Sequence, residues 1–385
     1  MTGETAAAPP NAGRKEWIRE LDVMRGLALA AVVFQHALGV YVRRPDIRLP
    51  DAAMIGMLFN FSKFAVPAFV FATGAVLFYN YYDRLNYAVF IRKRIMDIFL
   101  PYFLWTILYD LHYNGFRHID AARLIQMGRE TLSGTASYHL WFVVLIFQFY
   151  LLYPLLLDLF KQIRRLVSTP ARFTALMILL AAIYTWLMWL SASYIEGGYF
   201  HPTSGVIRLI FIDYRDRNFL FFSFYFILGA VAGVALTKWR EFVTRSVNWN
   251  VFLFVGLFLW VGYELMQGAS GNQVNLNYST SLKPSMFFYT VSQILLVYGL
   301  SLSLAAGGSR LYRPLRFAGK YSYGAYLVHA LVLEKVVQAM AHFPPVGPYI
   351  SQSTVAFAFT LVGSVAVTYL ISRIPYGNIL IGPHG

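Results

Sequence analysis

An arginine and a histidine lie eleven residues apart in one strongly apolar segment, at Arg25 and His36. An α-helix has about 3.6 residues per turn, so eleven residues make close to three turns and both side chains share a face. At about 1.5 Å per residue they are roughly 16 Å apart in depth, about half of a hydrocarbon core. An ionisable residue at that depth indicates a functional site. The alternative is a snorkelling arginine and a packed histidine that bonds a neighbouring helix.

The chemistry that such a pair could perform is proton abstraction beside a bound phosphate. Burial disfavours the imidazolium, so a neutral His36 could take a proton from a hydroxyl that attacks a thioester. Asp22, three residues before Arg25, is close enough to orient its guanidinium. Arg92 and Arg94 add charge on the same membrane side, and guanidinium groups are the preferred partners of phosphates. Together these residues could hold acyl-CoA, although positive-inside topology alone also explains the basic residues.

The composition is that of a polytopic membrane protein. The chain has 385 residues, of which 58% are hydrophobic and 13% charged, and its mean hydropathy is +0.54. The absence of cysteine excludes a disulfide framework, a thiol nucleophile and a cysteine-ligated metal. The net charge of +14 does not indicate nucleic acid, because the basic residues lie in short segments between apolar runs, next to the expected lipid bilayer.

The elements that must position these residues are membrane helices. We expect an all-α fold with about ten transmembrane helices, near 23–42, 54–80, 95–114, 138–160, 173–194, 218–237, 249–267, 284–306, 321–341 and 351–372. With the N-terminus inside, the inner segments hold twenty Lys and Arg residues and the outer loops ten. This ratio predicts that both termini are cytoplasmic.

The chain reads as one membrane domain with short tails. We expect a polar cytoplasmic tail at 1–20, a transmembrane domain at 21–373 and a short cytoplasmic tail at 374–385. The first apolar run is too long for a signal peptide and lacks a small-residue cleavage site. The expected location is therefore a membrane, as a multi-pass protein.

Several stretches, in order along the chain, resemble the membrane acyltransferase family 3. They are Leu21-Asp-Val-Met-Arg25-Gly-Leu-Ala with His36, Phe64-Ala-Val-Pro67-Ala-Phe-Val-Phe-Ala-Thr-Gly74, Arg92 with Arg94, Tyr138-His139-Leu-Trp141-Phe142, and Tyr321-Ser322-Tyr-Gly324-Ala-Tyr326-Leu-Val-His329. The resemblance implies transfer of an acyl group, usually acetyl from acetyl-CoA, to a hydroxyl of a bacterial envelope sugar or glycolipid. It also implies that His36 is catalytic and that the matching arginines bind the donor.

The chain departs from the family pattern in two respects, namely one residue of the second helix and the domains that are present. Thr73 stands before Gly74 where relatives often have serine. Some relatives also carry an extracytoplasmic esterase-like domain. We expect none in this chain, so it would deliver the acyl group itself or pass it to a separate extracytoplasmic partner. No metal and no tightly bound cofactor are expected, because metal-ligand and phosphate-loop motifs are missing from the sequence.

Further candidates lie on the outer side and in the ninth apolar segment. His139 and Trp141 could contact the acceptor sugar, although a tryptophan there is also favoured as an interfacial anchor. Ser322 could be a nucleophile but is more typical of a helix N-cap. Tyr326 belongs to the same resembling stretch, and His329, two turns into the helix, reads as a packing residue or a polar relay.

For two further patterns, a structural role is a better interpretation than a functional one. Gly229 and Gly233 form a small-xxx-small pattern that favours close packing within the chain over dimerisation. Acidic and basic residues within or near the spans are expected to pair inside the bundle or to reach an interface, with a proton path as the alternative: Asp97, Asp110, Glu264, Glu334 and Lys335.

A transporter is the second class of function that the sequence allows. Some proteins that resemble this family are described as polysaccharide exporters, and a buried arginine and histidine could line such a path. Transporters often contain inverted repeats, and none is evident in this sequence. The sequence therefore favours the enzyme.

Overall fold

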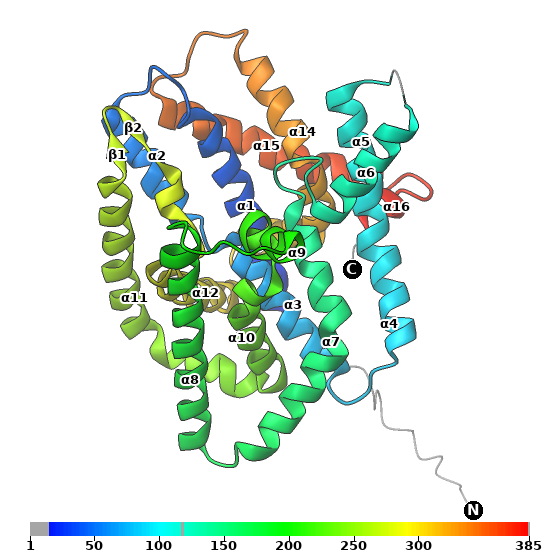
Figure 1. Cartoon of the computed structure of the whole chain (residues 1–385), viewed down its shortest axis with the longest axis vertical. Helices are drawn as coiled ribbons and strands as arrows, with labels where there is room; N and C mark the ends of the chain where they lie inside the picture. The colour runs from blue at the N-terminus through cyan, green and yellow to red at the C-terminus, as the bar shows by residue number, and fades with distance from the viewer. Residues whose placement is uncertain (1–14, 117–118, 384–385) are drawn as a thin grey trace, which may run out of the picture.

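The computed structural model describes residues 15–116 and 119–383, with the side chain of residue 277 left out. Helices make up nearly all of the regular structure, with one two-stranded hairpin between them (Figure 1). The α-helices are α1 (Arg19–Tyr41), α2 (Leu49–Phe61), α3 (Ala65–Tyr81), α4 (Tyr87–Arg94), α5 (Leu100–Asn114), α6 (Ala121–Ser133), α7 (Trp141–Leu166), α8 (Pro170–Trp189), α9 (Gly205–Arg208), α10 (Ser223–Val234), α11 (Leu236–Gln267), α12 (Pro284–Ala306), α13 (Tyr312–Lys320), α14 (Ser322–Met340), α15 (Tyr349–Ile371) and α16 (Asn378–Ile381).

Short irregular elements connect these helices. Three π-helical turns continue the helices α4, α8 and α9, and 3₁₀ turns precede α10 and α12. They are η1 (Ile95–Phe99), η2 (Leu190–Ile195), η3 (Leu209–Asp213), η4 (Arg215–Arg217), η5 (Phe219–Phe222) and η6 (Leu276–Ser279). The strands β1 (Ala269–Ser270) and β2 (Gln273–Val274) pair antiparallel, with Ala269 opposite Val274.

The prediction of a helical membrane protein is confirmed, but the count of about ten spans is not. Within the described residues, seven helical stretches are long and apolar enough to cross a membrane. They are Arg19–Tyr41, Leu49–Tyr81, Trp141–Leu166, Pro170–Ile195, Leu236–Gln267, Pro284–Ala306 and Tyr349–Ile371. Of the other three expected segments, one contains the short apolar helix Phe219–Val234, and the other two correspond to η1 with α5 and to α14.

Helix α1 runs through the middle of the bundle, in contact with α3, α12, α13, α14 and α15 (Figure 1). Its first turn is fixed by Glu20, which is only 2% exposed. The Glu20 carboxylate pairs with Arg240 of α11 at 2.7 Å and accepts a hydrogen bond from the Tyr298 hydroxyl of α12 at 2.9 Å. These contacts hold the start of α1 against α11 and α12.

The packing of α3 on α10 confirms the interpretation of the small-residue pattern. A Cβ atom on Gly229 or Gly233 would collide with the backbone of α3 at Phe71 or Ala75, and one on Gly74 would collide with α10. Only glycine allows two backbones to approach so closely. The pattern therefore serves contact between two helices of the same chain.

The connections separate into two ends of the bundle (Figure 1). The α1–α2, α11–α12 and α14–α15 connections lie at one end, and the α3–α4 and α7–α8 connections lie at the other. This alternation is that expected of successive spans. Which end faces the cytoplasm stays a prediction from the distribution of basic residues.

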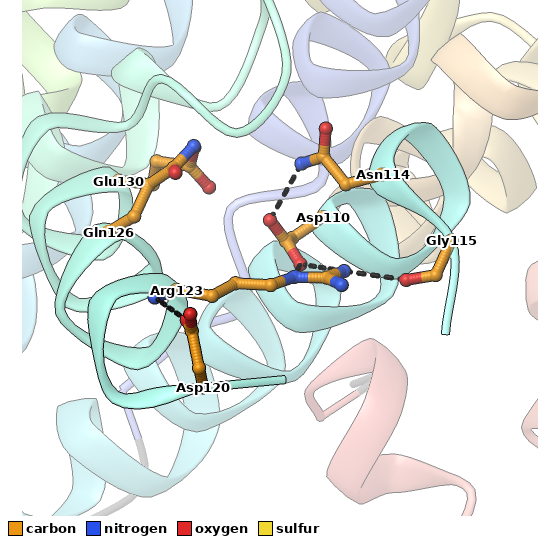
Figure 2. Close-up of polar contacts among 7 residues, drawn as sticks. All are labelled: Asp110, Asn114, Gly115, Asp120, Arg123, Gln126 and Glu130. Carbon is orange, nitrogen blue, oxygen red and sulfur yellow. Dashed lines mark hydrogen bonds and ion pairs between the residues drawn. The ribbon is translucent and has the colours of Figure 1, made fainter. Parts of the chain in front are cut away.

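The segment between α5 and α7, expected to be an outer loop, contains the amphipathic helix α6. A buried ion pair ties this helix to α5, because Asp110 accepts from Arg123 at 2.6 and 3.0 Å (Figure 2). Asn114 donates to the other Asp110 oxygen at 2.8 Å, and Arg123 also donates to the Gly115 carbonyl. The expectation that Asp110 pairs inside the protein is confirmed.

Three other ionisable residues of the spans also have partners. Glu334 pairs with His112 at 2.9 Å and with Lys335 at 3.0 Å, and Glu264 pairs with Lys283 at 2.7 Å. The expectation of internal or interfacial pairing is therefore confirmed for these residues too. The segment predicted as a C-terminal tail contains α16, which packs on α5, and the Leu380 carbonyl accepts from the Trp105 indole at 2.9 Å.

Candidate active site

A cavity of about 740 Å³ is lined by residues of α1, α3, α4, α7, α13 and α14. Its wall combines basic and aromatic side chains. The lining residues are Trp17, Asp22, Arg25, Phe69, Thr73, Arg94, Ile98, Phe142, Val143, Ile146, Tyr150, Tyr312, Arg313, Arg316, Phe317, Gly319, Lys320, Ser322, Tyr323, Tyr326 and Pro383. Five cations and one carboxylate face this space, which gives it a strongly positive character.

Arg25 and Asp22 form the pair that their spacing predicts. One Arg25 nitrogen lies 3.7 Å from one Asp22 oxygen, and Asp22 is only 6% exposed. The other Asp22 oxygen accepts from the Trp17 indole at 2.6 Å and lies 3.9 Å from Arg316 of α13. Asp22 therefore joins the first helix to a second source of guanidinium that the sequence reasoning did not include.

Helix α13 supplies three of the five cations of the cavity, namely Arg313, Arg316 and Lys320. Positions separated by three and then four residues lie on one face of a helix, so all three can point to the same space. From the sequence, these residues were interpreted only as basic residues that indicate which side of the membrane their segment faces. The spacing, on a short basic helix before the ninth apolar segment, was the signal that could have found them.

Arg94 and Arg92, predicted together as donor-binding residues, are placed differently. Arg94 lines the cavity, and its guanidinium lies 5.1 Å from the ring centroids of Phe90 and Tyr150. Arg92 is exposed and is not one of the described residues that line the cavity. Residues two apart in a helix point to nearly opposite sides, so only one of the two can face this space.

His36 lies beyond the inner end of the cavity and does not line it in the described part of the chain. The cavity reaches Tyr326 of α14, whose ring centroid is 5.6 Å from that of His329. The His329 ring is in turn stacked on His36, with centroids 5.1 Å apart and planes inclined by 30°. Arg25 and His36 thus share α1 as predicted, but Tyr326 and His329 lie between the cavity and the imidazole.

Three histidines from three parts of the sequence meet at this point. The ring centroid of His139 is 4.6 Å from that of His329, which contacts His36 on another side. His139 and His329 are 1% and 0% exposed, whereas His36 is half-buried. Tyr138, 54% exposed, covers His36 with its ring centroid 4.8 Å away. The cluster is therefore closed on the side of α14 and covered by a surface tyrosine on the other.

The hydrogen bonds of the two buried histidines determine which nitrogens carry protons. His329 Nδ1 lies 2.6 Å from the Tyr326 carbonyl oxygen, which can only accept, so Nδ1 is the donor. Nε2 of His329 then carries a lone pair, and it has no hydrogen-bond partner among the described residues. His139 is arranged in the same way, with Nε2 3.4 Å from the Leu327 carbonyl and Nδ1 without a partner in the described chain.

The remaining predicted residues separate into two groups. Ser322 and Tyr326 line the cavity, and the Tyr326 hydroxyl donates to the backbone carbonyl of His139. Trp141 is not among the described residues of the cavity wall, and its ring packs at 6.1 Å from Phe222. Thr73, the departure from the family pattern, does line the cavity, and its hydroxyl donates to the Phe69 carbonyl at 2.8 Å.

The arrangement can bind a polyanion and perform base chemistry a short distance away. Guanidinium groups bind phosphates in a bidentate manner, and apolar and aromatic walls suit the uncharged part of a ligand. Within the described residues, no group of three or more His, Asp or Glu side chains is arranged to hold a metal ion. The histidine cluster has two buried imidazole nitrogens without a hydrogen-bond partner in the described chain, as proton transfer would require.

Comparison with known proteins points to an acyltransferase. The model of a family described as an acyltransferase domain, acyltransferase family 3, matches residues 18–373. The chain is also similar to YfiQ of Bacillus subtilis, which its name describes provisionally as a membrane-bound acyltransferase. The two are 20% identical over 382 residues, which cover 95% of this chain and 94% of YfiQ. No solved structure matches the chain.

Proposed function

Because this chain belongs to acyltransferase family 3, we propose that it transfers an acyl group, acetyl in the simplest case, from acyl-CoA to a hydroxyl of a cell-envelope sugar, glycolipid or polysaccharide. It is a multi-pass membrane acyltransferase. The donor, the acceptor and a location in the bacterial cytoplasmic membrane are our proposal. The single observation that carries the choice of donor is the cationic cavity at the start of α1.

Acyl-CoA fits the cavity in charge and in size. Arg25, Arg94 and Arg316 lie on three different helices around one space, as required to surround a group of phosphates. A volume of about 740 Å³ is within the range of ligand sites. With the N-terminus in the cytoplasm, as the basic residues predict, the cavity opens toward the compartment that contains CoA.

The aromatic inner half of the cavity suits the pantetheine arm and the thioester. Phe69, Phe142 and Tyr326 lie on this part of the wall, and beyond Tyr326 the histidine cluster begins. A donor whose phosphates bind the arginines would therefore bring its thioester toward His36. The family resemblance assigns the base to this residue as well.

The reaction at this point is an exchange of one bond for another. His36 takes the proton of the acceptor hydroxyl while its oxygen bonds to the acyl carbon, and the carbon–sulfur bond then breaks. The proton finally resides on the sulfur of CoA. The acceptor approaches past Tyr138, because this residue beside His36 is 54% exposed, whereas His329 is fully buried.

The test is transfer by the purified protein in nanodiscs. Wild-type protein should release CoA from acetyl-CoA in the presence of an envelope glycan extract and add acetyl groups that mass spectrometry detects on the sugar. A polysaccharide exporter would not consume acetyl-CoA. Unchanged glycans and unchanged acetyl-CoA would overturn the proposal.

A further inference from the structure

The surface beside His36 carries a positive charge that the proposed reaction does not use. Arg43 follows His36 by seven residues, close to two helical turns, and Val42 continues the helical conformation of α1. The Arg43 guanidinium turns back along the helix and donates to the Gly39 carbonyl at 2.9 Å. Because Gly39 is only three residues from His36, this charge lies within roughly two helical turns of the imidazole.

Tyr138 presents a ring surface at the same place. Its ring centroid is 4.8 Å from that of His36, and half of the side chain is exposed, whereas the next residue, His139, is buried. The Tyr138 hydroxyl interacts electrostatically with Arg43, so the ring and the guanidinium border one space. A tyrosine has an electron-rich face and a polar hydroxyl, a combination that suits the C–H groups and hydroxyls of a sugar ring.

The three side chains have hydrogen-bonding capacity that the described part of the chain leaves unfilled. Neither the His36 ring nor the Tyr138 hydroxyl has a hydrogen-bond partner among the described residues. Arg43 bonds the Gly39 carbonyl through one of its nitrogens and has no acidic partner within the described ranges. An unfilled base, hydroxyl and guanidinium around one exposed ring indicate a polar ligand.

The charge of this surface selects the kind of ligand. Glu334 also acts on the Tyr138 hydroxyl, but its carboxylate is already bonded to His112 at 2.9 Å and to Lys335 at 3.0 Å. The charge of Arg43 has no such compensation. The surface therefore favours an anion, and a guanidinium binds carboxylates and phosphates in the same bidentate manner.

We propose that Tyr138 and Arg43 form the acceptor-binding site, and that the acceptor is an acidic glycan. The sugar ring stacks on Tyr138, its carboxylate or phosphate pairs with Arg43, and one of its hydroxyls then lies beside His36. Neutral glycans can use the ring but not the guanidinium, so the site distinguishes acceptors by charge. This inference rests on the proposed acyl transfer and adds a preference among the acceptors.

The test separates the acceptors by charge. An envelope glycan extract is divided by anion exchange into an acidic and a neutral fraction, and each is incubated with acetyl-CoA and the full chain in nanodiscs. Wild-type protein should acetylate the acidic fraction about tenfold faster or more, the value of one hydrogen bond to a charged group. Reduction of carboxylates to alcohols, or removal of phosphates with aqueous hydrogen fluoride, should abolish the preference and thereby identify the anion. A preference for the neutral fraction, or an acidic fraction insensitive to both treatments, would overturn the proposal.

Variants of neighbouring arginines provide the matched control. Arg43→Gln should lower acetylation of the acidic fraction about tenfold to a hundredfold and leave that of the neutral fraction nearly unchanged. Arg44→Gln removes the same charge from the next residue, which lies 5.9 Å from the Tyr41 ring, and should keep the preference. Tyr138→Ala should raise the KM of both fractions about twofold to tenfold, and Tyr138→Phe, which keeps the ring, should stay near the wild type.

The KM for acetyl-CoA should be unchanged in all of these variants, because neither residue belongs to the described wall of the donor cavity. Equal effects of Arg43→Gln and Arg44→Gln on the ratio of the two fractions would overturn the acceptor site alone. Wild-type protein that consumes no acetyl-CoA with either fraction would overturn the proposed function, and the acceptor site with it.

Discussion

Gly26 of α1 and Gly319 of α13 cross at a point where neither helix has room for a Cβ atom. A Cβ on Gly26 would lie 3.2 Å from the Gly319 nitrogen and closer still to the Leu315 carbonyl, and one on Gly319 would collide with the Asp22 carbonyl. This crossing brings the basic face of α13 beside Asp22 and Arg25. The charge of the cavity therefore depends on two glycines that lie far apart in the sequence.

Gly319→Ala should push α13 away from α1 and open the donor site. Because the obstructing atoms belong to the backbone, we expect a loss of about 1–3 kcal/mol in stability and a higher KM for acyl-CoA. Thermal unfolding in detergent and steady-state kinetics measure the two effects. Gly128→Ala, at an exposed helical position with open space, is the control and should be neutral or slightly stabilising. Equal behaviour of the two variants would show that the crossing is not tight.

Replacing His36 with alanine should remove the base without disturbing donor binding. We expect the rate constant for acyl transfer to fall roughly 10²- to 10⁴-fold, as for other positioned general bases, while the KM for acyl-CoA stays near its wild-type value. The cavity proposed to bind the donor does not include His36 among its described lining residues, which is why the two constants should separate. Retention of more than a tenth of the wild-type rate would exclude His36 as the base.

The two arginines of α4 provide an internal comparison of charge and position. Arg94→Gln should raise the KM for acyl-CoA about tenfold to a hundredfold, the usual value of a hydrogen bond to a charged group, because Arg94 lines the cavity. Arg92→Gln removes the same charge from an exposed position and should leave the KM nearly unchanged. With S-acetyl-pantetheine, which lacks the phosphates of the nucleotide, the two variants should behave alike. A larger effect at Arg92 would contradict this placement of the donor.

Local spacing predicted much of the site, and contacts between distant segments were beyond its reach. The shared helix of Arg25 and His36 and the pairing of Asp22 with Arg25 follow from helical periodicity. The same periodicity, applied to Arg92 and Arg94, would have shown that only one of them could face the cavity. That His329 lies against His36 depends on how α14 packs on α1, and single-sequence periodicity carries no information on this packing.

The prediction of about ten spans differs from the seven long apolar helices of the described residues for a physical reason of the same kind. An apolar run indicates burial in lipid or in protein, and hydropathy alone does not distinguish the two. α14 has most of its first half buried inside the bundle and carries Glu334 and Lys335 in its second half. The sequence predicts only a connection between the spans at 95–114 and 138–160, whereas the structure has α6 there, held by an ion pair.

That ion pair, between Asp110 and Arg123, gives the last prediction. Figure 2 shows the two side chains in contact. The Asp110 side chain is fully buried and that of Arg123 is 11% exposed, so loss of one partner leaves the other charge without compensation. Arg123→Met should therefore cost about 3–5 kcal/mol in stability. The double variant Asp110→Leu with Arg123→Met should recover most of this loss, because an apolar pair of similar volume needs no compensation. Thermal unfolding of the four proteins of this cycle measures the coupling. Additive losses of stability, without recovery in the double variant, would show that the two residues are not coupled. Since both residues lie outside the described wall of the cavity, the KM for acyl-CoA of each folded variant should match the wild type.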